Sequence, residues 1–266
     1  MSQAVAPVLN VRNLGKMFPS KSKEPSLAIL QGLSFILNEG EFVTMIGPSG
    51  SGKSTLLNIV CQIDTPTEGQ ILFRGDVINS PERVRAEPGC GGRIGYVMQE
   101  DNLLPWRTLR ANVEYPLAIQ GRLDAEARER VDALIDAVGL RGFENYYPHQ
   151  LSGGMRKRTS IIRTLAYDPP VILMDEPFGA LDAESRLSIQ GDLLKLWELG
   201  KKTILFVTHD ISEAIALGDR TIILTKSPAR IRGEHVIDIP RPRPLSTIVA
   251  TPQFPELFKK IRAQVG

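Results

Sequence analysis

Apolar positions along the chain follow patterns typical of both strands and helices. Residues 8–17 and 27–37 alternate loosely between apolar and polar side chains, which predicts strands with one buried face. Four short apolar runs predict more deeply buried strands: residues 41–46, 94–98, 171–174 and 203–207. The last two runs are continuously apolar, as in parallel strands covered on both faces, and a helical pattern over 183–199 connects them. The sequence therefore predicts an α/β fold with a parallel sheet.

Turn residues divide these strands. The turn at residues 38–40 separates 27–37 from 41–46 and predicts that these two strands pair as a hairpin. The polar stretch 80–92 is rich in Gly and Pro and is expected to be a loop. Shorter strands are expected at three further places: residues 70–73, 220–225 and 233–239. We expect an antiparallel β sub-domain beside the parallel core.

The middle of the chain has a helical pattern. Apolar residues recur at helical spacing through residues 107–141, and Ser152 is suited to cap the N-terminus of the next helix. We therefore expect a mostly helical sub-domain over about residues 100–165. It would be inserted into a single domain that spans residues 1–266.

Composition and charge narrow the class of protein. The 266 residues are 42% hydrophobic and 23% charged, and the net charge of +2 gives no electrostatic reason to expect a nucleic-acid partner. No apolar run approaches the length of about 18 residues that crosses a bilayer, and the N-terminus lacks the pattern of a signal peptide. Cys61 and Cys90 are far apart, and the three histidines are too scattered to suggest a metal site. These features predict a reduced, cytosolic chain.

A complete phosphate-binding loop follows the apolar run 41–46. Its residues match the pattern G-x-x-x-x-G-K-[ST] at every fixed position: Gly47, Pro48, Ser49, Gly50, Ser51, Gly52, Lys53, Ser54 and Thr55. The glycines let N–H groups turn inward around phosphate oxygens, and the helix expected next points its positive end at the same place. Lys53 is placed to reach the β- and γ-phosphates of a nucleoside triphosphate, and the Ser54 hydroxyl to ligate Mg²⁺. The alternative is an ordinary Gly/Ser turn, which the flanking strand and helix argue against.

Two carboxylates end the apolar run 171–174. Asp175 and Glu176 follow it directly, and ligands of open α/β sheets bind at the carboxyl ends of strands. Asp175 is therefore expected near Mg²⁺, directly or through water, and Glu176 is expected to polarise the attacking water. An apolar strand that ends in Asp-Glu is by itself often a capped turn, so this interpretation depends on the phosphate loop upstream.

A third motif, Leu151-Ser152-Gly153-Gly154-Met155, makes the sequence resemble the ATP-binding subunits of ABC transporters. The resemblance covers roughly residues 8–240 and has the family's motifs in order: the phosphate loop, Gln99, the signature 151–155, Asp175-Glu176, Ala180-Leu181-Asp182 and His209. A serine and two glycines at a helix start expose N–H groups, which suits an anion. The phosphate loop already supplies one anion site. The resemblance therefore implies a P-loop NTPase core of ABC type that forms a head-to-tail homodimer around two ATP molecules.

The resemblance also implies roles for single residues. Gln99 would contact Mg²⁺ and the attacking water, His209 would sense the γ-phosphate, and Asp182 would contact the partner subunit. Phe18 would stack on adenine, as an aromatic residue usually does at this place in the family. The residues alone leave other interpretations open: Gln99 as a polar residue at a strand edge, His209 as a helix cap, and Phe18 as an apolar residue of the first strands.

Three positions depart from the usual family pattern. Met155 replaces glutamine, as is common in importers, Lys157 stands where glutamine is usual, and Thr164 replaces a small alanine. None of these changes removes a catalytic group. The basic cluster Arg156-Lys157-Arg158 resembles a nucleic-acid patch, but a solvated helix face is the interpretation we favour.

These motifs favour the energy-coupling ATPase of an importer, bound peripherally to the cytoplasmic face of the membrane. Two copies would close on ATP, act on transmembrane permease subunits, then hydrolyse and reopen. An extracytoplasmic solute-binding protein would join through the permease. The main alternative is a soluble ABC protein in DNA repair or ribosome function, but such proteins typically carry two cassettes or a long coiled coil, and this chain has one phosphate loop. A small-molecule kinase would leave the signature and His209 unexplained.

The loop after Gln99 is a candidate contact with the permease. Leu103, Leu104 and Trp106 are large apolar residues in a segment otherwise marked as loop. Exposed apolar patches often mark interfaces, and Trp is enriched in their hot spots. The alternative is that these side chains pack into the helical sub-domain.

Residues 101–106 with Asn112-Val113, together with 175–183 and 240–243, resemble the nitrate, sulfonate and taurine importer family. The resemblance implies import of small oxyanions or organic sulfonates. None of these residues contacts solute, so the residues themselves support only a docking loop, an ATPase loop and a tail. We expect the tail, about residues 240–266, to start extended at its prolines and to end in a short amphipathic helix over 255–265.

Overall fold

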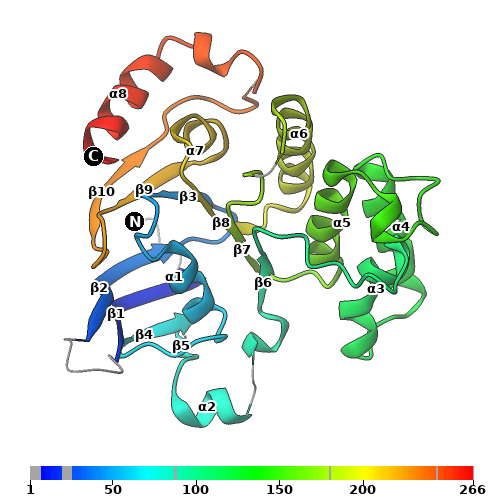
Figure 1. Cartoon of the computed structure of the whole chain (residues 1–266), viewed down its shortest axis with the longest axis horizontal. Helices are drawn as coiled ribbons and strands as arrows, with labels where there is room; N and C mark the ends of the chain where they lie inside the picture. Colours follow the sequence, from blue (N-terminus) through cyan, green and yellow to red (C-terminus); the bar gives the residue numbers. More distant parts are fainter. Residues whose placement is uncertain (1–6, 20–25, 87–88, 180, 244, 266) are drawn as a thin grey trace, which may run out of the picture.

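The computed structural model describes residues 7–19, 26–86, 89–179, 181–243 and 245–265, which form two sheets with helices around them (Figure 1). The larger sheet contains, in spatial order, β10 (Ile231–Val236), β9 (Arg220–Leu224), β3 (Phe42–Ile46), β8 (Thr203–Thr208), β7 (Val171–Asp175) and β6 (Ile94–Val97). Its neighbouring strands are parallel except for β10, which pairs antiparallel with β9. The smaller sheet is antiparallel throughout. The predicted α/β fold class with an antiparallel sub-domain is confirmed.

The central strands of the larger sheet are buried on both faces. In β8, Leu205 and Val207 belong to one hydrophobic cluster, which also contains side chains of α1 (Lys53–Val60). Ile204 and Phe206 belong to a second cluster on the other face, together with side chains of two more helices: α6 (Ala183–Gly200) and α7 (Ile211–Leu217). Because successive side chains of a strand point to opposite faces, a strand covered on both faces needs a continuous apolar run.

The smaller sheet corrects one expectation about strand pairing. Its spatial order is β2 (Leu27–Leu37), β1 (Leu9–Phe18), β4 (Glu68–Phe73) and β5 (Asp76–Val77). β2 pairs with β1, Leu37 opposite Leu9, and β3 lies in the other sheet between β8 and β9. The predicted hairpin between residues 27–37 and 41–46 is therefore wrong. β3 is hydrogen-bonded to β8 along one edge and to β9 along the other, so it has no edge left for β2, and all of its residues are buried.

A second expectation concerns the stretch 80–92, which is not all loop. It contains the short helix α2 (Pro81–Ala86) and a 3₁₀ turn at Gly89–Gly92. Ser80 Oγ accepts a hydrogen bond from the backbone N–H of Arg83, so a local cap starts a helix that the high Gly and Pro content masked.

Three helices lie together at one side of the molecule (Figure 1). They are α3 (Leu109–Ile119), α4 (Ala125–Ala137) and α5 (Gly153–Ala166), and they enclose a hydrophobic cluster of their own. The side chains of Thr108, Asp124 and Ser152 cap their N-termini. In the described residues, every helix is too short or too polar to cross a membrane.

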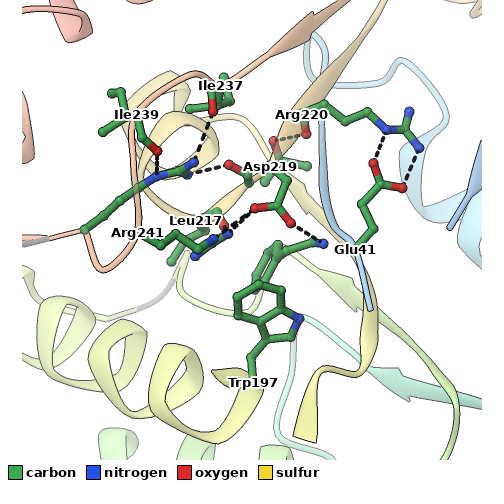
Figure 2. Close-up of polar contacts among 12 residues, drawn as sticks. Glu41, Trp197, Leu217, Asp219, Arg220, Ile237, Ile239 and Arg241 are labelled. Carbon is green, nitrogen blue, oxygen red and sulfur yellow. Dashed lines mark hydrogen bonds and ion pairs between the residues drawn. The ribbon is translucent and has the colours of Figure 1, made fainter. Parts of the chain in front are cut away.

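The C-terminal tail is anchored to the core through arginines. Arg241 donates from Nε to Asp219 Oδ1 at 2.9 Å, and its guanidinium carbon lies 4.3 Å from the ring centroid of Trp197 (Figure 2). Arg243 is buried and donates to the carbonyls of residues 215, 218, 237 and 239. Burial lowers the pKa of Arg243 to about 10. The tail ends in α8 (Phe254–Val265), whose apolar side packs on the second hydrophobic cluster.

Candidate functional site

The phosphate loop connects β3 to α1. Gly52 is the N-cap of α1 in the left-handed conformation, with φ 86°, and no side chain caps the helix. A Cβ atom added at Gly52 would lie 2.6 Å from Cγ2 of Ile29, so both the dihedral angle and the space require glycine. The first backbone N–H groups of α1 are thus left for another acceptor, at the positive end of the helix dipole.

A cavity of about 330 Å³ opens beside this loop. It is lined by residues 49–55 together with Ile29, Gln99 and Glu176. The structure thus brings the phosphate loop, Gln99 two residues after β6 and Glu176 directly after β7 to one cavity at the carboxyl ends of the parallel strands. Ile29, on β2, is a contribution that the sequence did not indicate, because nothing in its pattern distinguishes it from other strand residues.

Lys53, Glu176 and His209 form a chain of charged and polar contacts at this cavity. Lys53 is buried, and its Nζ donates to Gly47 O at 2.9 Å and lies 3.6 Å from Glu176 Oε1. The other carboxylate oxygen, Oε2, is 2.8 Å from His209 Nδ1. Glu176 has a φ of 40°, in the left-handed region that is unfavourable for a non-glycine residue and that is often found at functional sites.

Asp175 lies at the end of β7 next to Ser54. It accepts hydrogen bonds from the Ser54 hydroxyl and, at 3.3 Å, from the Tyr96 hydroxyl. Burial raises the pKa of Asp175, and the Glu176 carboxylate raises it further. Tyr96 was not identified from the sequence. It could have been found as a residue with a polar hydroxyl in β6, the strand that pairs with β7.

The donors around the loop suit Mg²⁺. Ser54 offers a hydroxyl, Asp175 a carboxylate and Gln99 an amide oxygen, and Mg²⁺ prefers oxygen ligands. Among the described residues there is no cluster of three or more His, Cys, Asp or Glu side chains that would enclose a metal. Mg²⁺ typically uses one or two carboxylates and completes its shell with phosphate and water, so this sparse set fits it.

The signature residues lie elsewhere. Leu151 is buried, whereas Ser152 and Gly153 are exposed, and Ser152 Oγ accepts a hydrogen bond from the backbone N–H of Met155 at 3.2 Å. None of the residues 151–155, all of which the structure describes, lines the cavity at the phosphate loop. The signature therefore lies at an exposed helix N-terminus, apart from the cavity at the phosphate loop.

Asp182 and Phe18 are both at the surface. Asp182 is the N-cap of α6, and its hydrogen bonds with Ser185 lower the pKa of the carboxyl group. Ala180 of the same motif lies outside the described residues. Phe18 ends β1 with its ring exposed, and Lys16 Nζ lies 4.8 Å from the ring centroid. Phe18 does not line the cavity at the phosphate loop, and its exposure excludes a place in the core.

Comparison with known proteins decides the family. The sequence profile of the ABC transporter family matches residues 30–179, more than half of the chain. The chain belongs to the ABC transporter family. An uncharacterised ABC transporter ATP-binding protein of Methanocaldococcus jannaschii is 44% identical over 95% of this chain and 89% of its own length. The aliphatic sulfonates import ATP-binding protein of Bacillus cereus is 38% identical over 96% of this chain and 95% of its own. The nitrate import ATP-binding protein of Synechocystis is 38% identical over 94% of this chain and 91% of its own length.

Solved structures of ABC cassettes have the same fold as this chain. A dimeric bacterial ABC transporter cassette has a TM-score of 0.73 and 37% identity, over 87% of this chain and 99% of that one. The same scores and coverage hold for a dimeric cassette in a post-hydrolysis state bound to ADP and phosphate. The predicted ABC-type fold is confirmed, and the chain is an ABC ATPase.

The basic cluster of this ABC ATPase is not a solvated helix face, so that prediction is wrong. Lys157 is 2% exposed and donates from Nζ to Met98 O at 2.8 Å and to Gln99 O at 2.9 Å. Arg156 bonds to Asp101 and Arg158 to Asp192. Burial lowers the pKa of Lys157 to about 8. The sequence spacing could have indicated the burial of Lys157, because this residue lies one helical turn before the buried Ile161 and therefore on the same face of the helix.

The loop after Gln99 presents an exposed aromatic side chain. Trp106 is 71% exposed, so the alternative that it packs into the helical group is wrong for this residue. Asn112 is fully buried and fixes the loop, accepting from the Leu104 N–H at 2.8 Å and donating to three loop carbonyls. A cavity of about 420 Å³ adjoins this loop, with Leu104, Tyr115 and Ile119 among its lining residues.

Proposed function

We propose that this chain is the ATP-hydrolysing subunit of an importer for small oxyanions or organic sulfonates. The observation that carries the proposal is the identity of 38%, over more than nine-tenths of both chains, to import ATP-binding proteins for aliphatic sulfonates and for nitrate. The subunit would act peripherally at the cytoplasmic face of the membrane on separate permease subunits. A solute-binding protein outside the membrane would meet it only through the permease.

Residues in and around the cavity would divide the work of ATP hydrolysis. Lys53 and the backbone N–H groups of the loop would bind the β- and γ-phosphates, since they bring positive charge to one place. Glu176 would hold and polarise the attacking water. His209 would orient Glu176 and contact the γ-phosphate, which is supported by its distance of 2.8 Å from the Glu176 carboxylate. Phe18 would stack on the adenine ring.

Three oxygen donors would hold Mg²⁺: the Ser54 hydroxyl, the Asp175 carboxylate and the Gln99 amide. The metal ion would neutralise charge on the β- and γ-phosphates. The hydrogen bond between Ser54 and Asp175 supports this assignment, since it places the hydroxyl and the carboxylate side by side.

A second copy of the chain would complete each ATP site. Ser152 and Gly153 are exposed at a helix N-terminus outside the chain's own cavity, which suits a phosphate bound by another copy. Asp182 would contact the partner near the same place. The dimeric state of the related cassettes supports this arrangement.

Growth of a deletion strain on single sulfur and nitrogen sources tests the solute class. We expect growth to fail on nitrate, on taurine or on alkanesulfonates and to be restored by the intact gene. The solute class is wrong if growth on all three is unimpaired and the cognate binding protein binds none of them. The ATPase mechanism would survive that result, because it depends on different residues.

Co-purification with the permease separates an importer from a soluble ABC protein. Trp106 is the candidate anchor, since large exposed aromatic residues dominate interface energies. We expect Trp106→Ala to reduce complex formation while the isolated subunit keeps its ATPase activity. Leu199→Ala, at an 85% exposed residue on α6, is the matched control and should leave the complex unchanged. Equal binding by both variants would remove Trp106 from the interface, and absence of any permease in the purified complex would favour the soluble alternative.

A further inference from the structure

Helix α5 holds the first part of the loop that follows β6, residues 98–102. Lys157 donates to the carbonyls of Met98 and Gln99, and Arg163 donates to Asp101 O at 3.0 Å and to Asn102 O at 2.7 Å. Arg156 Nε adds a bond of 2.9 Å to the Asp101 carboxylate. Basic side chains of one helix therefore bind four of the five residues 98–102, and one of these four, Gln99, lines the ATP cavity with its side chain.

Lys157 is the unusual member of this group. Its side chain is 2% exposed, and the ammonium group gives up water for the two loop carbonyls. Burying an ammonium group is unfavourable unless it is well hydrogen-bonded, so its presence indicates that these two bonds matter. One bond ends on the carbonyl of Gln99, whose side chain reaches the cavity, and the other on the carbonyl of Met98, the residue before it.

The helix and the strand that leads to Gln99 are in close contact. α5 lies beside β6 in Figure 1. A Cβ atom added at Gly95 of β6 would lie 2.6 Å from Thr164 Cγ2 of α5, so the two elements approach as closely as glycine permits. A displacement of α5 would therefore be transmitted to the end of β6.

We propose that Lys157 is a positioning residue that aims the Gln99 side chain at the ATP cavity by holding the backbone carbonyls of Met98 and Gln99. It also ties this loop to the helix that begins with the signature. Movement of α5, when its N-terminus engages a phosphate of the partner's ATP, then moves Gln99 in the chain's own cavity. Lys157 thus couples the two ATP sites of the dimer. This inference rests on the proposed role of Gln99.

The test compares the unchanged protein with Lys157→Met, whose unbranched side chain is one atom shorter and has no hydrogen-bond donor. We expect kcat for ATP hydrolysis to fall roughly ten- to a hundredfold, as misplaced catalytic groups do, and the Mg²⁺ concentration for half-maximal activity to rise. The affinity for a fluorescent ATP analogue should stay within about twofold, because Lys157 touches no phosphate-loop residue. Lys157→Gln retains an N–H donor and should keep more activity than Lys157→Met.

The matched control is Arg130→Met. Arg130 Nε also donates to a backbone carbonyl of α5, that of Ala166, at the opposite end of the helix from the signature. This variant should keep kcat and its Mg²⁺ dependence unchanged. An equal loss in Arg130→Met and Lys157→Met would show that any damage to α5 suffices and would overturn the proposal.

A double-mutant cycle with Gln99→Ala decides whether Lys157 acts through Gln99. The double variant should be no slower than Gln99→Ala alone, because there is then no side chain left to aim. If the two losses multiply, or if Lys157→Met hydrolyses ATP at the normal rate, the proposal is overturned. If Gln99→Ala itself has normal activity, the proposed role of Gln99 fails first, which is a distinguishable result. Should Lys157→Met not fold, Lys157→Gln carries the same cycle.

Discussion

Two helices of this ABC ATPase present their N-termini in opposite ways. α1 begins at Gly52, in the left-handed conformation with no side-chain cap, and its first residues line a cavity. α5 begins at Ser152, in an extended conformation, and the Ser152 side chain accepts the N–H of Met155 at an exposed position. The free N–H groups at a helix start need acceptors, and the two ends differ in how they obtain them.

The difference supports the proposal that one chain supplies most of one phosphate site and part of another. At α1, Lys53, Ser54 and Glu176 line a cavity at the helix end. At α5, the serine satisfies one N–H locally, and residues 151–155 lie outside the cavity at the phosphate loop. We infer that α1 provides binding by itself, whereas α5 contributes only when a second copy brings it a phosphate.

Of the variants that test this difference between α1 and α5, Lys53→Ala should have the largest effect. Removing the ammonium group from the complete site should lower ATP hydrolysis by at least about a hundredfold, since it provides charge at the β/γ oxygens. Phosphate-release assays measure this, with Lys259→Ala on the exposed side of α8 as the control. Normal hydrolysis by Lys53→Ala would show that α1 does not bind the reacting phosphate.

Glu176→Gln separates binding at α1 from chemistry. The amide keeps the shape but cannot polarise water, so hydrolysis should fall by about 10²–10⁴-fold while ATP still binds. The closed dimer should then accumulate with ATP and be visible by light scattering. Rapid turnover in this variant would mean that another group is the base.

Ser152→Arg tests the incomplete site at α5. Bulk and competing charge at the signature should prevent dimer closure in the Glu176→Gln background without affecting ATP binding to the monomer. Ser152→Ala separates the role of Ser152 in phosphate binding from its role as a helix cap, since loss of an N-cap alone costs about 1 kcal/mol of stability. Asp124→Ala, at the cap of α4, should show the same loss of stability with normal dimerisation. Unchanged dimerisation in Ser152→Arg would contradict the shared site.

Phe18→Ala should have the smallest effect. Stacking of the ring on adenine would contribute about 1 kcal/mol, so ATP affinity should fall roughly fivefold. Binding of inorganic triphosphate, which has no base to stack, should be unchanged, and calorimetry can measure both. An equal loss for both ligands would mean that Phe18 acts on the fold of β1 and not on the base.

The sequence by itself determined the features that depend on short stretches of chain. The phosphate loop depends on Gly50 and Gly52, which have positive φ, and the cap at Ser152 depends on a side chain that bonds to the next turn. Strand runs such as 203–207 could be identified because burial on both faces demands an unbroken apolar run. These are local requirements, and a local pattern is enough to show them.

Only the tertiary structure decided which distant segments meet. β3 does not pair with β2 but with β8 and β9, because strand pairing depends on partners far along the chain. Lys157 proved buried because the carbonyls after β6 lie across from it, and Arg241 proved anchored because Asp219 and Trp197 converge on it (Figure 2). A charged side chain has the same local pattern whether it faces water or a carbonyl, so its role depends on what the fold places opposite it.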